Sequence, residues 1–168
     1  MIKVCGLRGR GFTLIEILVT LAIMALLIFM AVPLSTEWTN SGQTLKARGT
    51  LSDGYAYAKA LALRNPCAAP NATGNHAATL EASTNGTKVT LSVLAQGNPS
   101  NCTYLKTRPN PQWKYSLPDG VKLSRDGSML VTGTPFNLTI DNRGQPSMSS
   151  EILLSLGAAK NDETIELH

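Results

Sequence analysis

The sequence predicts an α+β protein in which one long N-terminal helix packs on an antiparallel β-sheet or sandwich domain. An apolar run near the N-terminus is long enough for a transmembrane helix, and an amphipathic stretch continues it towards residue 65. After residue 77, short β-rich segments alternate with Asn-Gly and Asp-Gly turns. With 168 residues and 43% hydrophobic content, the chain has the length of one domain, which excludes a disordered or collagen-like protein.

Most of the net positive charge comes from the N-terminus. Charged residues make up 15% of the chain, below the roughly 25% of soluble domains, and the formal net charge is +4. Without Lys3, Arg8 and Arg10, the basic count falls from 15 to 12 against 11 acidic side chains. Because the rest of the chain is close to neutral, composition does not favour nucleic acid as a partner.

The apolar run Phe12–Val32 reads FTLIEILVTLAIMALLIFMAV, and Glu16 is its one charged residue. As a helix it spans about 31 Å, which matches the roughly 30 Å hydrocarbon core of a bilayer. Basic residues precede the run, so the positive-inside rule places the N-terminus in the cytoplasm and the following chain outside. Secretory signals have shorter apolar stretches, although Ala31 leaves a conventional cleavage site formally open.

Glu16 is the exceptional residue of this segment. A carboxylate inside a membrane span costs roughly 2.5–3.5 kcal/mol on insertion scales and normally has a partner or a function. The apolar run contains no Lys or Arg, so the partner must come from a chain terminus, another subunit or a proton. The alternative is a carboxylate close to the membrane interface that reaches water or is protonated there.

The segment from Gly11 to Glu16 reads GFTLIE, follows a short basic leader and opens an unbroken apolar helix. This pattern resembles the prepilin peptidase site of type IV pilins and type II secretion pseudopilins. The resemblance implies cleavage between Gly11 and Phe12, N-methylation of Phe12 and retention of the helix. It also implies that Glu16 is an assembly residue, neutralised in a filament by the N-terminal amine of a neighbouring subunit.

The same resemblance implies partners and a location. The expected partners are a prepilin peptidase/N-methyltransferase, other minor and major pilins or pseudopilins, the inner-membrane assembly platform and membrane lipid. The chain is expected in the cell inner membrane as a single-pass protein with a periplasmic C-terminal domain, and then at a pilus or pseudopilus tip.

The expected organisation has four parts. Residues 1–11 form a leader that is removed, 12–33 a transmembrane helix, 34–65 its amphipathic continuation, and 66–168 a periplasmic β-rich domain. Pro33 is expected to kink the continuing helix, and Asn65-Pro66 to end it. The residues expected to form its apolar face are Trp38, Leu45, Leu51, Tyr55, Ala58 and Ala62.

Nine strands are expected in the last part, all with β-branched or aromatic residues between turn signals. They are 78–83, 88–95, 103–106, 114–117, 121–124, 129–132, 136–140, 152–156 and 163–167.

Two further elements carry a second resemblance. The helix end Ala56–Leu61 with Arg64, and the run Phe136–Pro146 followed by a strand, are similar to the GspH/FimT/FimU-type minor pseudopilin family. The resemblance implies a structural subunit of a type IV pilus or a type II secretion pseudopilus, acting in twitching motility or protein secretion. DNA-binding members of the FimT branch carry a basic motif near their end, whereas this chain ends in the acidic segment Asp162–His168. A DNA-binding minor pilin acting in DNA uptake is the alternative.

Cys67 and Cys102 lie 35 positions apart in the exported part, where an oxidising periplasm favours a disulfide. Free buried thiols and a metal site are the alternatives, although no nearby His supports a metal. The residues Tyr104, Lys106, Arg108, Trp113, Lys114 and Tyr115 interleave cations with aromatics, which is typical either of stacking on nucleic acid or of a hairpin with solvated charges. No nucleophile motif, phosphate loop or dinucleotide fingerprint is present, so neither an enzyme nor a cofactor is expected.

Overall fold

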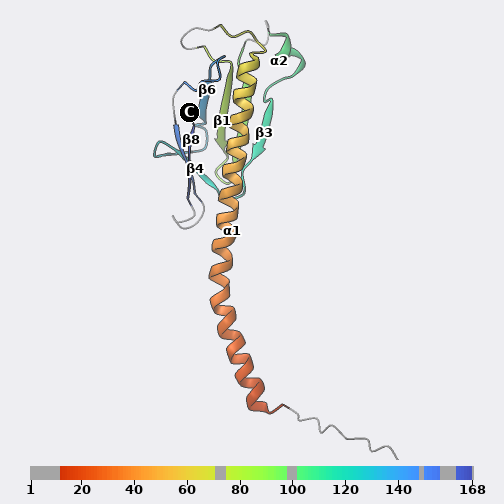
Figure 1. Cartoon of the computed structure of the whole chain (residues 1–168), viewed down its shortest axis with the longest axis vertical. Helices are drawn as coiled ribbons and strands as arrows, with labels where there is room; N and C mark the ends of the chain where they lie inside the picture. Colours follow the sequence, from red (N-terminus) through yellow and green to blue (C-terminus); the bar gives the residue numbers. More distant parts are fainter. Residues whose placement is uncertain (1–11, 71–74, 98–101, 148–149, 156–161, 168) are drawn as a thin grey trace, which may run out of the picture. The chain divides into compact units, whose positions relative to one another are not determined.

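The computed structural model describes residues 12–70, 75–97, 102–147, 150–155 and 162–167. The chain divides into two compact units, Met1–Trp38 and Thr39–His168. Helix α1 (Leu14–Arg64) supplies most of the described part of the first unit and also the first element of the second. The eight strands and the short helix α2 (Thr103–Thr107) all belong to the second unit (Figure 1).

Helix α1 ends where the sequence predicts. Asn65 follows its last residue with a left-handed backbone (φ +42°), a conformation that Asn tolerates better than most residues. The Asn65 N–H donates to the carbonyl of Leu61, 3.1 Å away, and its side chain both accepts from and donates to the backbone of Ala69. The expected stop at Asn65-Pro66 is therefore confirmed.

The strands form two antiparallel sheets of four. The first has the order β3-β2-β1-β6 and the second the order β5-β4-β7-β8. The first sheet contains β1 (Ala78–Thr84), β2 (Val89–Ala95), β3 (Trp113–Ser116) and β6 (Phe136–Ile140). The second contains β4 (Lys122–Arg125), β5 (Ser128–Met129), β7 (Ser150–Ser155) and β8 (Glu163–Leu167). Every pairing is antiparallel, which confirms the α+β class.

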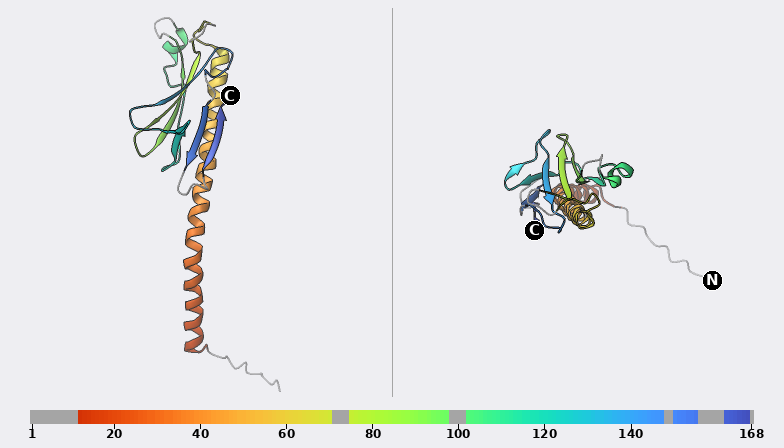
Figure 2. Two further views of the ribbon diagram at one scale, coloured as in Figure 1. Left: turned by 90° about the vertical axis from the view of Figure 1, so that its left-hand side faces the viewer. Right: turned by 90° about the horizontal axis from the view of Figure 1, so that it is seen from above.

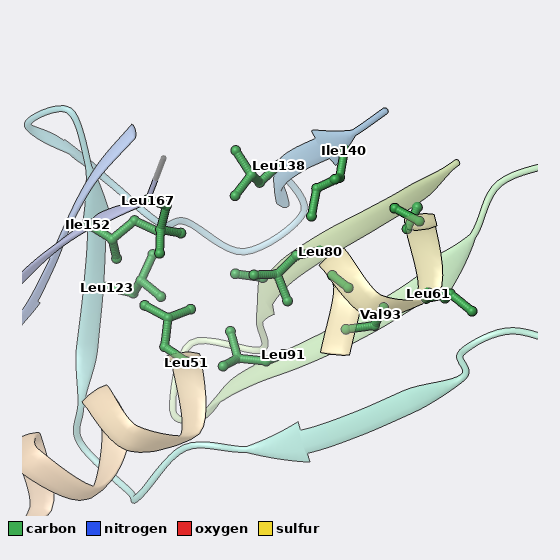
Figure 3. Close-up of a cluster of buried hydrophobic side chains, with 14 of the residues drawn as sticks. Leu51, Leu61, Leu80, Leu91, Val93, Leu123, Leu138, Ile140, Ile152 and Leu167 are labelled. Carbon is green, nitrogen blue, oxygen red and sulfur yellow. The ribbon is translucent and has the colours of Figure 1, made fainter. Parts of the chain in front are cut away.

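The core of the second unit lies where the helix and both sheets meet (Figures 2 and 3). Leu51 of α1, Leu80 of β1 and Leu123 of β4 are each at most 3% exposed. The close-up shows the labelled side chains of both sheets turned towards one another, with Leu51 among them. Burial of apolar side chains against three elements holds this part of α1 in place.

The buried face of α1 differs from the expected one in its first half. Trp38 and Leu45 are 77% and 51% exposed, so their placement on the apolar face is wrong. The face that is buried begins with Thr44 and Ala47 and continues through Leu51 and its successors at spacings of three and four. The large apolar residues predict the wrong face of the helix here, because small residues occupy the face where the helix approaches the sheet closely.

The predicted strand 103–106 is helix α2 instead. Its N-cap, Cys102, is held by a disulfide, and Lys106 N–H donates to the carbonyl of Cys102 at 3.3 Å. The Thr107 hydroxyl also bonds back to the carbonyls of Thr103 and Tyr104. Strand β2 has neighbours on both sides, β1 and β3, so residues 103–106 do not pair with the strand that precedes them in the chain. Local bonding overrides their β-propensity.

The predicted strand 129–132 is shortened to β5 (Ser128–Met129). Beyond it, Val131 forms an isolated bridge with Thr134 around Gly133, whose φ is +88°. This tight turn takes the chain out of the sheet. The other seven predicted strands are present with ends shifted by up to two residues, and position 156 lies outside the described residues.

Gly54 and Gly49 provide a matched test of the helix–sheet contact. A Cβ at Gly54 would lie 3.0 Å from Cζ3 and 3.1 Å from Cη2 of Trp113, whereas one at Gly49 would meet nothing within 4 Å. Gly54→Leu is therefore expected to lower the free energy of unfolding by about 1–3 kcal/mol through overpacking. Gly49→Leu is expected to raise it by up to about 1 kcal/mol through helix propensity. Urea unfolding of the full chain in detergent measures both, and equal effects would contradict the packing described here.

Candidate functional site: the N-terminal segment of helix α1

Thr13 caps the start of α1. Its carbonyl accepts the N–H groups of Glu16 and Ile17 at 3.1 and 3.3 Å, and its side-chain Oγ1 accepts from the Glu16 N–H at 3.4 Å. Ser or Thr three residues before Glu is the capping-box pattern, in which the cap hydroxyl satisfies a free N–H of the first turn. The capping role of Thr13 was not among the sequence-based predictions, although the spacing Thr-x-x-Glu is its signal.

Glu16 lies in the first turn of α1 and is exposed. No ion pair joins its carboxylate to another described residue of the chain. The unsatisfied N–H groups at a helix N-terminus carry partial positive charge, which favours a carboxylate there at modest strength. Within the described part of one chain, Glu16 is thus positioned by the helix but has no cation to neutralise it.

The side chains around Glu16 are apolar and uncovered. Phe12, Leu14 and Phe29 are each about 80% exposed, and every residue between positions 12 and 30 is exposed. Among the described residues, α1 is the one helix long and apolar enough to cross a membrane, judged by length and composition. Because uncovered apolar surface is unfavourable in water, this segment requires lipid or other helices around it.

Two of the expected site features are not tested. Gly11 lies outside the described residues, so the bond expected to be cleaved, between Gly11 and Phe12, is not described. Helix α1 runs through position 33, but the kink expected at Pro33 stays a prediction.

The disulfide Cys67–Cys102 is present, with its Cα atoms 5.0 Å apart. It joins the segment after α1 to the start of α2, and free thiols and metal ligation are therefore excluded for this pair. Gly97 packs directly against it, because a Cβ at this position would lie 2.6 Å from the Cβ of Cys67. Among the described residues there is no group of three or more His, Cys, Asp or Glu side chains suited to a metal ion.

The interleaved cations and aromatics do not form one surface. The Tyr104 hydroxyl donates to Gln112 Oε1 at 2.9 Å, and the Arg108 guanidinium lies 5.8 Å from the centre of the Tyr104 ring. The rings of Trp113 and Tyr115 are 6.2 Å apart on β3. Strand alternation turns the intervening Lys114 to the opposite face of the sheet.

Near the end of α1, a second cation contacts a ring. The Lys59 ammonium lies 5.2 Å from the centre of the Tyr55 ring. Burial raises the pKa of the Tyr55 phenol above its ordinary value, because the anion would lose its hydration. Tyr55 therefore stays neutral at physiological pH and serves as packing surface.

Residues 7–32 match the family model described as the prokaryotic N-terminal methylation motif. The comparison with curated proteins found no match, and the comparison with solved structures found none either. The matched region includes Gly11, Phe12 and Glu16 and ends within the apolar segment of α1. This motif supports a type IV pilin or pseudopilin, which implies processing by prepilin peptidase and assembly with other pilins.

Proposed function

We propose that this chain is a minor pilin or pseudopilin of the GspH/FimT/FimU type. It joins the tip or initiation complex of a type IV pilus or type II secretion pseudopilus and supports assembly of the filament. One observation carries the proposal: Glu16, a carboxylate with no ion-pair partner among the described residues, stands at the head of an uncovered apolar helix inside a methylation motif. A membrane anchor alone gains nothing from such a carboxylate, which is costly in lipid, whereas a helix that assembles with others gains an ion pair when a neighbour supplies the cation.

The proposed pathway begins in the inner membrane. The chain inserts once, with its basic leader in the cytoplasm and the β-rich domain in the periplasm. Prepilin peptidase cuts between Gly11 and Phe12, and the new amine of Phe12 is methylated. This amine is a cation, and in a helical bundle of low dielectric it neutralises the Glu16 carboxylate of a neighbouring subunit. The chain acts through assembly and carries out no chemistry itself.

The loop after β6 supports the subfamily assignment. The Asp141 carboxylate accepts the N–H groups of Arg143 and Gln145 at 2.9 and 2.8 Å, which fixes a tight turn. Gly144 of this turn packs against Leu63, and a Cβ there would lie 3.3 Å from the Leu63 side chain. The two elements similar to the GspH/FimT/FimU family are thus in contact at the end of α1.

A deletion strain tests the proposal. Surface pili with twitching motility, secretion of exoproteins and DNA uptake are scored in parallel, with the wild-type chain returned on a plasmid. We expect loss either of pili or of secretion, and rescue by the wild-type chain. Loss of DNA uptake with the other two intact would favour the DNA-binding alternative, and three unaffected phenotypes would contradict a role in assembly.

A further inference from the structure

Trp38 is a large aromatic side chain that the fold leaves uncovered. It is 77% exposed and does not belong to the buried cluster of the described residues. It lies in the same compact unit as the apolar segment of α1. Its neighbours Glu37 and Thr39 are polar, and no other Phe, Tyr or Trp stands between Phe29 and Tyr55. An indole has an apolar ring and one N–H donor, so it is most stable where an apolar medium meets a wet one.

The distance of Trp38 from the apolar run fits the outer interface of a bilayer. The run ends at Val32, six residues earlier, and α1 continues without a break between the two positions. Trp38 therefore lies about 9 Å beyond the run at the helical rise of about 1.5 Å per residue. Each polar region that flanks the hydrocarbon core is about 5–8 Å thick. A displacement of the helix by about 5 Å towards the cytoplasm places the ring within this region, where Trp and Tyr are enriched.

The same displacement changes the depth of Glu16. When the apolar run is centred in the bilayer, Glu16 lies about 9 Å from the midplane and about 6 Å inside the hydrocarbon core. After a displacement of about 5 Å, it lies within about 1 Å of the cytoplasmic boundary of the core. A charge close to this boundary costs less than one near the helix centre, because headgroups and water are within reach. Trp38 and Glu16 therefore favour the same position of α1 in the membrane.

We propose that Trp38 anchors α1 among the lipid headgroups at the periplasmic face of the membrane, and thereby holds Glu16 at the cytoplasmic boundary until a neighbouring subunit supplies a cation. Lipid suits this position better than a protein partner, because Trp38 follows, on the same helix, the segment that is long and apolar enough to cross a bilayer. The inference rests on the proposed function, which supplies the inner membrane and the orientation of the chain. The displacement also moves Phe12, and with it the bond expected to be cleaved, from the edge of the hydrocarbon towards the cytoplasm.

Fluorescence quenching measures the depth of Trp38. The full chain is reconstituted in vesicles of phosphatidylethanolamine and phosphatidylglycerol whose acyl chains carry bromine either near the headgroup or near the chain end. Trp113 is present in both the wild type and Trp38→Phe, so the difference between their spectra is the signal of Trp38. We expect bromine near the headgroup to quench this signal about twice as strongly as bromine near the chain end, as for an indole at the interface.

The contrary outcomes separate this inference from the proposed function. A chain that resists carbonate extraction, but whose Trp38 signal is quenched by aqueous iodide and by neither brominated lipid, would overturn this inference alone. Strongest quenching by bromine near the chain end would do the same. A chain that carbonate extracts from the vesicles would overturn the proposed function and this inference together.

The rate of leader removal in cells tests the consequence for the N-terminal segment. Trp38→Ala is expected to slow cleavage of the pulse-labelled chain by about fivefold, because the helix loses the anchor that sets its depth. Trp38→Tyr is expected to keep the wild-type rate, since Tyr is also enriched at interfaces. The matched control is Leu45→Ala, which removes an exposed apolar side chain of α1 about 11 Å farther from the membrane and is expected to have no effect.

An unchanged cleavage rate in Trp38→Ala would show that Trp38 does not set the depth of α1, and would overturn the inference. A wild-type chain that keeps its leader would contradict the proposed function as well.

Discussion

Replacing Glu16 with alanine is expected to leave the chain inserted in the membrane and processed, but to remove it from assembled filaments. The substitution removes a carboxylate from an apolar segment, so insertion becomes easier by roughly 2.5–3.5 kcal/mol on insertion scales. In the bundle it leaves the methylated amine of a neighbour buried without a counter-charge, which costs about 3–5 kcal/mol. Incorporation should therefore fall by about a hundredfold or more. Immunoblots of membrane and sheared filament fractions measure both quantities.

Two controls separate charge from other properties of Glu16. Glu16→Gln keeps the size and hydrogen-bonding capacity of the side chain but not its charge, and it is expected to be as defective as the alanine variant. Glu37→Ala removes the other carboxylate in the N-terminal half of α1, outside the apolar run, and is expected to assemble normally. Filaments containing the Glu16→Ala chain at the wild-type level would show that Glu16 has no role in assembly.

The second large effect is expected from the disulfide. Replacing both Cys67 and Cys102 with alanine should lower the free energy of unfolding by about 4 kcal/mol, from the chain-entropy relation for a closed loop of this length. The loss arises mainly in the unfolded chain, which is freed from a constraint. Urea unfolding of the full chain in detergent, with and without reductant, measures it.

Reduction serves as the internal control for this prediction. Reductant should destabilise the wild-type chain to the level of the double variant and leave the double variant unchanged. Gly97→Ala should also be destabilising, because its Cβ would overlap the Cys67 side chain at a backbone φ of +149°. Alkylation of both cysteines in folded protein without reductant would contradict the bridge.

Periodicity and turn chemistry were sufficient to predict the architecture. The long apolar run and the Asn65-Pro66 stop predicted α1, and β6 and β8 have the predicted ends. The motif around Glu16 was visible because a single carboxylate in an apolar helix is exceptional in any sequence. These features depend on residues that lie close together in the sequence, so the sequence alone is enough to predict them.

What could not be predicted depends on contacts between distant elements. Residues 103–107 have the composition of a strand, but they follow the bridge from Cys102 to Cys67 and form local helical hydrogen bonds instead. The buried face of α1 includes Thr44 and Gly54, which no hydrophobic pattern identifies.

The N-terminal residue of the mature chain tests the central claim most directly. Purified filaments or membranes from the native host provide the chain, and mass spectrometry of its N-terminal peptide identifies the first residue and its modification. The account predicts a chain that begins at Phe12 with a methylated amine and retains the apolar helix. A mature chain that begins at Met1, or at a residue beyond Ala31, would contradict it.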